Sequence, residues 1–417
     1  MDPKKISVID FTYTLPDERI AGFPQAERDA SRLLIYRDGS IGEDIYRNIG
    51  HYLPENSLLI FNNTKVVEAR IVFQKPTGGR IEIFCLEPGP GYPDITTAMT
   101  QTGSVSWKCL IGGVSKWKPG QVLTRTITRG SGETGPEIIL EATWLEKLED
   151  CFLVRLNWSP SGMSFAALLH EAGLIPLPPY IKRAVEGSDA ERYQTVYALH
   201  DGSVAAPTAG LHFTDEILQG FAARNIKNLF VTLHIGAGTF KPVQHSVLDQ
   251  HTMHAEFIAV HCSAIESLVA VFDSPHPAPV VPIGTTSLRT IESLYWLGVK
   301  TIRQPDIDPA ELVVLQWDPY EMQQWEVTPV KSLASLLAWM KRQGLESLST
   351  RTQLLIAPGY AWKMTSALVT NFHQPGSTLL LLVAALIGED WRKVYGYALA
   401  NGFRFLSYGD GCLLFRA

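Results

Sequence analysis

Six short β-rich segments follow one another in the first half of the chain, with hardly any helical periodicity between them. They lie at 69–73, 80–86, 106–111, 121–127, 137–142 and 151–156. The turn sequences TGG (77–79), KPG (118–120) and SG (131–132) separate them. A series of short strands with such turns is typical of a small barrel or sandwich. We therefore place an inserted antiparallel β-barrel domain at residues 66–157.

Residues 1–65 and 158–417 alternate between strand and helix patterns, which favours a mixed α/β domain that receives the β block as an insertion. Ser164 and Thr214 stand where side-chain N-caps of two helices are expected. We expect helices at 165–171, after Thr214, from 288 to about 297, and at 377–387, where the wholly apolar sequence predicts burial. We expect strands at 57–62, 229–234, 280–283, 354–357, 403–408 and 412–415.

Composition excludes several classes of protein. The net charge is −6, so the chain as a whole is no basic nucleic-acid binder. Its longest purely apolar run has nine residues, 379–387, whereas a membrane helix needs about 20. The five cysteines include no CxxC pair, which fits a reducing cytoplasm. We expect a cytoplasmic protein, a monomer, with no membrane contact.

Charge is uneven along the chain. Residues 331–417 carry nine Lys and Arg against four Asp and Glu, so the rest of the chain is strongly acidic. This excess predicts a surface for a polyanion, and chance clustering is the competing interpretation. Its candidate contacts are Lys363, Arg392, Lys393 and Arg404.

Two stretches combine a histidine with small residues that let a ligand approach the backbone. The first, AAPTAGLHFT at 205–214, contains Thr208 and His212 and runs into a helix start. The second, TLHIGAGTF at 232–240, places His234 before a Gly-x-Gly turn. That turn could hold a nucleotide ribose, although it lacks the third glycine of a full dinucleotide motif. A tight connection with a core histidine is the alternative for both.

Two further stretches offer other chemistry. In HTMHAE at 251–256, His254 and Glu256 could act as a base with its orienting partner, or as metal ligands, but the zincin spacing is absent and we expect no metal. GTTS at 284–287 and TNFHQPGST at 370–378 each precede a helix. Free N–H groups at such positions bind carboxylate or phosphate, unless the hydroxyl side chains serve only as caps.

Nine blocks follow one another over nearly the whole chain. They are FTYTLP with RDASRLL (11–34), LIFNNTKV (59–66), ERYQTVY (191–197), AAPTAGLHFT (205–214), TLHIGAGTF (232–240), HTMH (251–254), GTTSLR (284–289), TNFH (370–373) and SYGD (407–410). In this order they resemble the S-adenosylmethionine:tRNA ribosyltransferase-isomerase family of queuosine biosynthesis.

The chain departs from that family at three places. Gln374 stands where the family usually has Leu, Gly411-Cys412 replaces Ala-Met, and the segment 300–349 is longer. Aromatic residues of that segment, Trp317, Tyr320 and Trp325, either pin it to the core or form a stacking surface.

The resemblance implies an α/β fold with an inserted β-barrel, and transfer of the ribosyl part of S-adenosylmethionine to 7-aminomethyl-7-deazaguanine at the tRNA wobble position. Isomerisation then gives epoxyqueuosine, and adenine and methionine leave. S-adenosylmethionine is a co-substrate, the tRNA anticodon arm is the partner, and no cofactor is permanently bound. There are two alternatives: a methyltransferase that uses S-adenosylmethionine, and a paralogue that binds tRNA without the ribosyltransferase-isomerase activity.

Candidate roles follow from the matched blocks. A sulfonium acidifies the adjacent C5′ protons, so a neutral base is needed, and histidine is neutral near pH 7. We rank His212 and His234 first, then His254 with Glu256, and His373 last; Asp410 is the reserve. The expected substrate-binding residues are Thr208, Gly236, Gly238, Thr239, Gly284, Thr285, Thr286, Arg289, Asn371 and His373.

Overall fold

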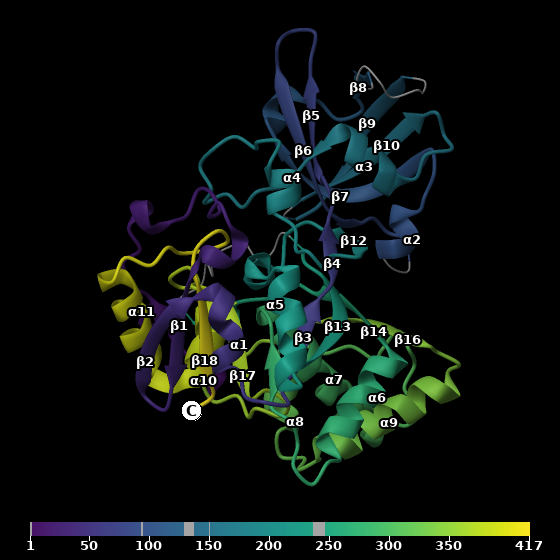
Figure 1. Cartoon of the computed structure of the whole chain (residues 1–417). Helices are drawn as coiled ribbons and strands as arrows, with labels where there is room; N and C mark the ends of the chain where they lie inside the picture. Colours follow the sequence, from purple (N-terminus) through teal and green to yellow (C-terminus); the bar gives the residue numbers. More distant parts are fainter. Residues whose placement is uncertain (1, 93–94, 129–136, 150, 237–246) are drawn as a thin grey trace.

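The structure is a computed structural model that describes residues 2–92, 95–128, 137–149, 151–236 and 247–417. It has an upper part formed by one antiparallel sheet and a lower part that combines two sheets with helices (Figure 1). In these described ranges no helix combines the length and the apolar character that crossing a membrane requires.

All six predicted β-rich segments form strands of the upper sheet, which has the order β11-β5-β6-β7-β10-β9-β8 and is antiparallel throughout. Buried and half-exposed residues alternate along β6, so one face packs on the core and the other faces water. The sheet curls into a half-barrel, and helix α3 leads into the short strand β11 at its edge. The strands are β5 (Arg70–Gln74), β6 (Arg80–Pro88), β7 (Ser104–Gly112), β8 (Val122–Ile127), β9 (Ile138–Lys147), β10 (Phe152–Ser159) and β11 (Gly173–Leu174), with helices α2 (Ile95–Met99) and α3 (Phe165–Ala172).

The antiparallel β insertion is therefore confirmed as a fold. Because β11 pairs with β5, the sheet draws on residues beyond 157, and the boundaries 66–157 stay a prediction. A short parallel pair, β4 (Thr64–Val66) with β12 (His200–Ser203), lies where the chain passes between the two parts.

A five-stranded mixed sheet, β15-β3-β13-β14-β16, forms the centre of the lower part. β3 is buried along its whole length between parallel neighbours, which agrees with its continuous apolar sequence. Helices α6, α7 and α9 lie together beside this sheet (Figure 1). The elements are β3 (Leu58–Asn62), β13 (Lys227–His234), β14 (Glu256–His261), β15 (Val280–Pro282), β16 (Ser347–Thr352), α6 (Cys262–Phe272), α7 (Thr285–Arg303), α8 (Asp318–Met322) and α9 (Pro329–Arg342).

A second sheet, β17-β18-β1-β2, lies beside the first, and a parallel bridge between Ile283 and Val369 connects the two. This bridge brings the ends of β15 and β17 together, and each of those strands leads towards a helix. The elements are β1 (Arg32–Arg37), β2 (Ser40–Ile45), β17 (Ala367–Asn371), β18 (Gly411–Phe415), α1 (Ile49–Tyr52), α4 (Asp189–Arg192), α5 (Asp215–Gly220), α10 (Thr378–Ile387) and α11 (Trp391–Ala400).

Two predicted strands do not form. Residues 354–357 are buried, but side chains satisfy their backbone: Leu354 O accepts from Arg289, and the Tyr320 hydroxyl bonds Leu355 O and Ala357 N. Residues 403–408 turn at Leu406, whose φ of 69° is incompatible with a strand. The helix expected to end near 297 continues to Arg303.

Residues of the segment 300–349 contribute to the hydrophobic core of the lower part of the molecule, which combines sheets and helices. Trp317 and Tyr320 are partly buried against that core, which confirms that they pin the segment in place. Trp325 is 37% exposed.

Candidate active site

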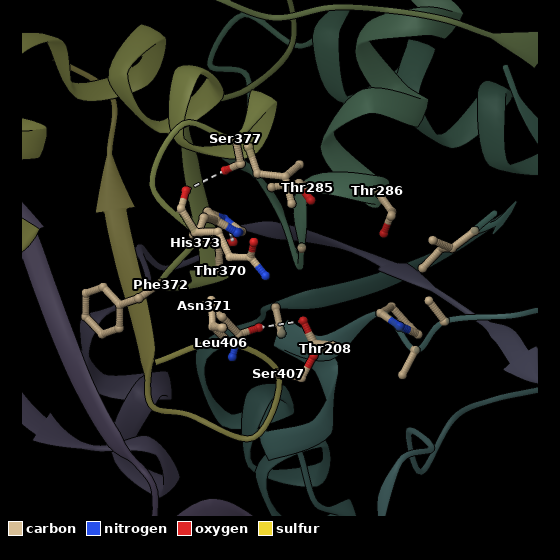
Figure 2. A pocket seen from close by; sticks show the side chains of 18 of the residues that line it. Thr208, Thr285, Thr286, Thr370, Asn371, Phe372, His373, Ser377, Leu406 and Ser407 are labelled. Carbon is tan, nitrogen blue, oxygen red and sulfur yellow. Dashed lines mark hydrogen bonds between the residues drawn. The ribbon is translucent and has the colours of Figure 1, made fainter. Parts of the chain in front are cut away.

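A pocket lies where β15 and β17 end and where α7 and α10 begin (Figure 2). It is lined by residues from four of the stretches that sequence analysis singled out, although they are spread over some two hundred positions of the chain. Its lining within the described residues contains hydroxyl, amide, imidazole and apolar groups but no carboxylate, ammonium or guanidinium. The lining residues are Tyr180, Ala205, Ala206, Pro207, Thr208, Ala209, Ile235, Gly284, Thr285, Thr286, Thr370, Asn371, Phe372, His373, Gln374, Ser377, Leu379, Leu406 and Ser407.

The two helix starts at this pocket differ in their capping. At α10, Ser377 Oγ accepts from Leu380 N, so one of the first N–H groups is satisfied. At α7 the cap position is Gly284, which offers no side-chain acceptor to the first turn. Its φ of 86° with ψ of 155° is a conformation that essentially only glycine adopts. The partial positive charge of the α7 N-terminus therefore faces a pocket that can receive an anionic group.

Asn371 organises one wall of the pocket. Thr208 Oγ1 donates to Asn371 Oδ1 over 2.8 Å, as Figure 2 shows, and Asn371 Nδ2 lies 3.3 Å from His212 Nε2. His212 is buried, and burial lowers its pKa to about 4. Its ring does not line this pocket; it lies behind Asn371 and borders a neighbouring hollow with Arg28 and Arg192. The structure thus brings Thr208, Asn371 and His212 together.

His373 is the one of the four candidate histidines that lines the described pocket. Its Nε2 lies 2.9 Å from Thr370 Oγ1, and burial lowers its pKa to about 3. Two tyrosines fix its backbone: Tyr13 donates to its carbonyl, and its N–H donates to Tyr395 Oη over 3.0 Å.

His234 ends β13 and is buried, with Nδ1 3.1 Å from Thr64 Oγ1. A Cβ at Gly202 would come within 2.8 Å of that nitrogen, so only glycine fits beside this ring. His234 does not line the pocket, but the next residue, Ile235, does. Gly236 is partly buried. Gly238 and Thr239 lie outside the described residues.

The third stretch is divided. His254 is exposed, whereas Glu256 is buried at the start of β14 and forms an ion pair with Arg289 of α7. In the described part of the chain, Glu256 Oε1 and Arg289 Nη2 have no hydrogen-bond partner. Glu256 thus has Arg289 as its charged contact, and the role of His254 with Glu256 stays a prediction.

Sequence reasoning did not place Tyr180 and Ser407 in the pocket. The Tyr180 hydroxyl and Ser407 Oγ are 2.6 Å apart and close one side. Ser407 lies in the matched SYGD block, which was a usable signal, whereas Tyr180 follows a proline run whose sequence predicts only a loop. Asp410 of the same block is buried and accepts from the backbone N–H groups of Arg32 and Arg404.

The four predicted tRNA-contacting side chains of the C-terminal region are engaged in different ways. Lys363 lies over the rings of Tyr295 and Trp296. Arg392 pairs with Glu389, and Lys393 donates to Gly39 O. Arg404 donates to Phe23 O near the pocket. Their grouping as one tRNA surface stays a prediction.

A polar pocket at strand ends and helix starts defines an α/β protein with a binding site for a small, partly anionic ligand. Residues 8–414 match the family model described as queuosine biosynthesis protein. The chain is 37% identical to the S-adenosylmethionine:tRNA ribosyltransferase-isomerase of Anaeromyxobacter sp. (strain Fw109-5), over 98% of this chain and 99% of that one. It is 34% identical to that of Magnetococcus marinus, over 97% and 93%.

A crystal structure of the Thermotoga maritima S-adenosylmethionine tRNA ribosyltransferase is 26% identical, covers 97% of this chain and 99% of that chain, and gives a TM-score of 0.44. By the family model and the full-length relatives, the chain belongs to the queuosine biosynthesis family of S-adenosylmethionine:tRNA ribosyltransferase-isomerases.

Proposed function

We propose that this chain transfers the ribosyl moiety of S-adenosylmethionine to 7-aminomethyl-7-deazaguanine at the tRNA wobble position and isomerises it, which gives epoxyqueuosine-tRNA with release of adenine and methionine. The relatives that match over their full length bear the name of this activity. The observation that carries the proposal is the convergence of five matched blocks, 205–214, 232–240, 284–289, 370–373 and 407–410, on one pocket. S-adenosylmethionine is the co-substrate, and no cofactor is permanently bound.

The pocket supplies complementary groups for S-adenosylmethionine. The first turn of α7, at Gly284, Thr285 and Thr286, receives the methionine carboxylate, because its N–H groups have no side-chain cap. Thr208, Asn371 and His373 offer neutral polar groups to the ribose. Three further residues stay proposed ligand contacts: Gly236, Gly238 and Thr239. Arg289, whose guanidinium is paired with Glu256, also stays a proposed contact.

Deprotonation at C5′ starts the reaction, since the neighbouring sulfonium stabilises the ylide that forms. Ring opening then expels adenine, the aminomethyl nitrogen attacks, and epoxide closure expels methionine. His212, His234 and His254 with Glu256 are the proposed bases, and the structure distinguishes their settings. His212 is buried next to Asn371 of the pocket wall, His234 is buried one residue from Ile235 of the lining, and His254 is exposed.

The test is product analysis with tRNA that carries the aminomethyl-deazaguanine at the wobble position. Adenine and methionine should appear in equal amounts, and digested tRNA should contain epoxyqueuosine. tRNA with guanine at that position is the control and should give none. A methyltransferase would instead release S-adenosylhomocysteine, and a binding-only paralogue would retain tRNA without release of adenine.

A further inference from the structure

An aromatic side chain stands exposed beside the pocket. Phe23 is 51% exposed, and the guanidinium carbon of Arg183 lies 4.1 Å from the centre of its ring. One face of the ring is thus supported by a cation, which fixes the ring without covering it. Phe23 also lines a surface hollow with Tyr180 and Lys182.

This hollow adjoins the pocket. Tyr180 lines both of them, and its hydroxyl lies 2.6 Å from Ser407 Oγ on the pocket wall. Ser407 in turn borders the hollow that contains His212. A polymeric ligand that inserts one of its units into the pocket would therefore bring an adjacent unit close to Phe23.

Three arginines lie in or beside the segment that carries Phe23, and their guanidinium groups donate to backbone carbonyls. Arg404 bonds Phe23 O, Arg192 bonds Gln25 O over 2.6 Å and Ala26 O over 3.0 Å, and Arg28 bonds Glu191 O over 2.7 Å. A carbonyl orients a guanidinium but does not neutralise it. Across the described ranges none of the three forms a salt bridge with a carboxylate.

The adjacent cations behave differently. Lys182 is paired with Asp17 over 2.5 Å, and Arg183 with buried Asp189 over 2.7 Å. Their charges are balanced, so Arg183 supports the Phe23 ring while its charge is paired with Asp189. Near the pocket, the cations that no salt bridge among the described residues engages are therefore Arg28, Arg192 and Arg404.

We propose that Phe23, Arg28, Arg192 and Arg404 form a binding surface for single-stranded RNA, in which Phe23 stacks on an anticodon-loop base next to the wobble nucleotide and the arginines hold its phosphates. Exposed aromatic rings among cations bind unpaired nucleotides in this manner, since every base has a stacking face. The inference rests on the proposed function for the identity of the RNA. It differs from the C-terminal surface predicted above, of which it keeps only Arg404.

The test compares Phe23→Ala with the unchanged protein. We expect the affinity for a fluorescent anticodon stem-loop, measured by anisotropy, to fall about 10-fold, the effect typical of one lost stacking contact. The KM for tRNA should rise by a similar factor, and kcat at saturating tRNA should stay the same. Phe23→Trp restores a stacking ring and should restore affinity.

Trp325→Ala is the matched control. Trp325 is also partly exposed and supported by an arginine, Arg303 at 4.2 Å from the ring centre, but it lines none of the described hollows. Its replacement should leave RNA affinity unchanged. Equal affinities of Phe23→Ala and Trp325→Ala would overturn the proposal.

The arginines are tested by the salt dependence of stem-loop affinity. Arg404→Gln removes one phosphate contact and should reduce the slope of log affinity against log salt by about 1. An unchanged slope would contradict the role of Arg404. Failure of the proposed function would look different: the unchanged protein would bind the stem-loop and yet release no adenine from modified tRNA.

Discussion

Thr208 Oγ1 donates a 2.8 Å hydrogen bond to Asn371 Oδ1, although the two residues are 163 positions apart in the chain. Asn371 turns its amide nitrogen to His212 Nε2, so one amide joins a pocket hydroxyl to a buried imidazole. Because Asn371 donates through its NH₂ group, His212 Nε2 is the accepting nitrogen and the ring proton resides on Nδ1. Asn371 thereby sets the tautomer of a candidate base.

Replacement of Asn371 tests this relationship. Asn371→Ala leaves His212 without its polar neighbour and Thr208 without its acceptor, so the free energy of unfolding should fall by about 1–3 kcal/mol. The rate of adenine release should fall by more than the loss of folded protein explains, because both groups adjoin the pocket. Denaturant titration and the adenine assay measure the two effects. Thr208→Ser keeps the donor and should behave as the unchanged protein; equal losses in both variants would contradict the relationship.

Local sequence signals predicted a large part of the fold. Ser164 Oγ and Thr214 Oγ1 accept from Ala167 N and Ile217 N, so both predicted caps are confirmed. The short β-rich segments between turn sequences predicted the strands of the half-barrel. Both signals act within a few residues of one another, which is why they can be seen in the sequence.

The missing parts depend on distant partners. Residues 354–357 have the apolar character of a strand, but the side chains of Arg289 and Tyr320 take up their backbone groups. Tyr180 enters the pocket only because Ser407 meets it from 227 residues away. The blocks that line the pocket were identified by resemblance, and their convergence follows from the pairing of β15 and β17 ends, which spacing along the chain does not encode.

The buried histidines predict a pH dependence of stability. Burial lowers the pKa of His212 to about 4 and that of His373 to about 3, below the usual 6.5 of an unfolded chain. Protonation therefore favours unfolding. The stabilising contribution is complete above about pH 6.5 and is lost as the pH falls towards 4 for His212 and towards 3 for His373. At pH 5 each of these two buried histidines should lower the free energy of unfolding by about 2 kcal/mol relative to pH 7.

His373→Gln removes one of these groups. The difference in unfolding free energy between pH 7 and pH 5, measured by urea titration, should shrink by about 2 kcal/mol. His254→Gln is the control, since His254 is exposed, and its difference should match that of the unchanged protein. An unaltered pH dependence in His373→Gln would show that His373 is not held neutral by burial.

Single alanine variants of the four histidines should identify the base. Loss of a general base costs about 10²–10⁴ in rate, while S-adenosylmethionine still binds. We expect the large loss at His212 or His234, which are buried beside the pocket, and a change of a few-fold at exposed His254. Single-turnover adenine release is the measurement. If all four variants retained turnover within a few-fold, Asp410 or Glu256 would become the candidate.

Gly284→Ala tests the start of α7. The space around a Cβ is sufficient, since Ala209 Cβ and Thr286 Oγ1 would lie 3.7 Å away, so the cost comes from the backbone conformation. We expect a loss of about 1–3 kcal/mol in stability and a raised KM for S-adenosylmethionine. Gly187→Ala, at an exposed position without positive φ, is the control. A Gly284→Ala protein with unchanged KM would remove the α7 N-terminus from the site.

The buried pair Arg289–Glu256 gives the last prediction. Arg289→Met leaves the Glu256 carboxylate buried at the sheet without its cation, and breaking such a pair costs about 3–5 kcal/mol. Arg289→Met with Glu256→Leu removes both charges and should recover most of that stability, because the desolvation penalty disappears with them. Denaturant titration of the unchanged protein, Arg289→Met, Glu256→Leu and the double variant closes the cycle. A double variant as unstable as Arg289→Met would show that the ion pair itself is not the source. The double variant also decides the role of the pair. Glu256 Oε1 and Arg289 Nη2 lack partners among the described residues, so if they bind S-adenosylmethionine, the stable double variant should lose adenine release. If it retains release, the pair serves the fold, and Glu256 is not the base.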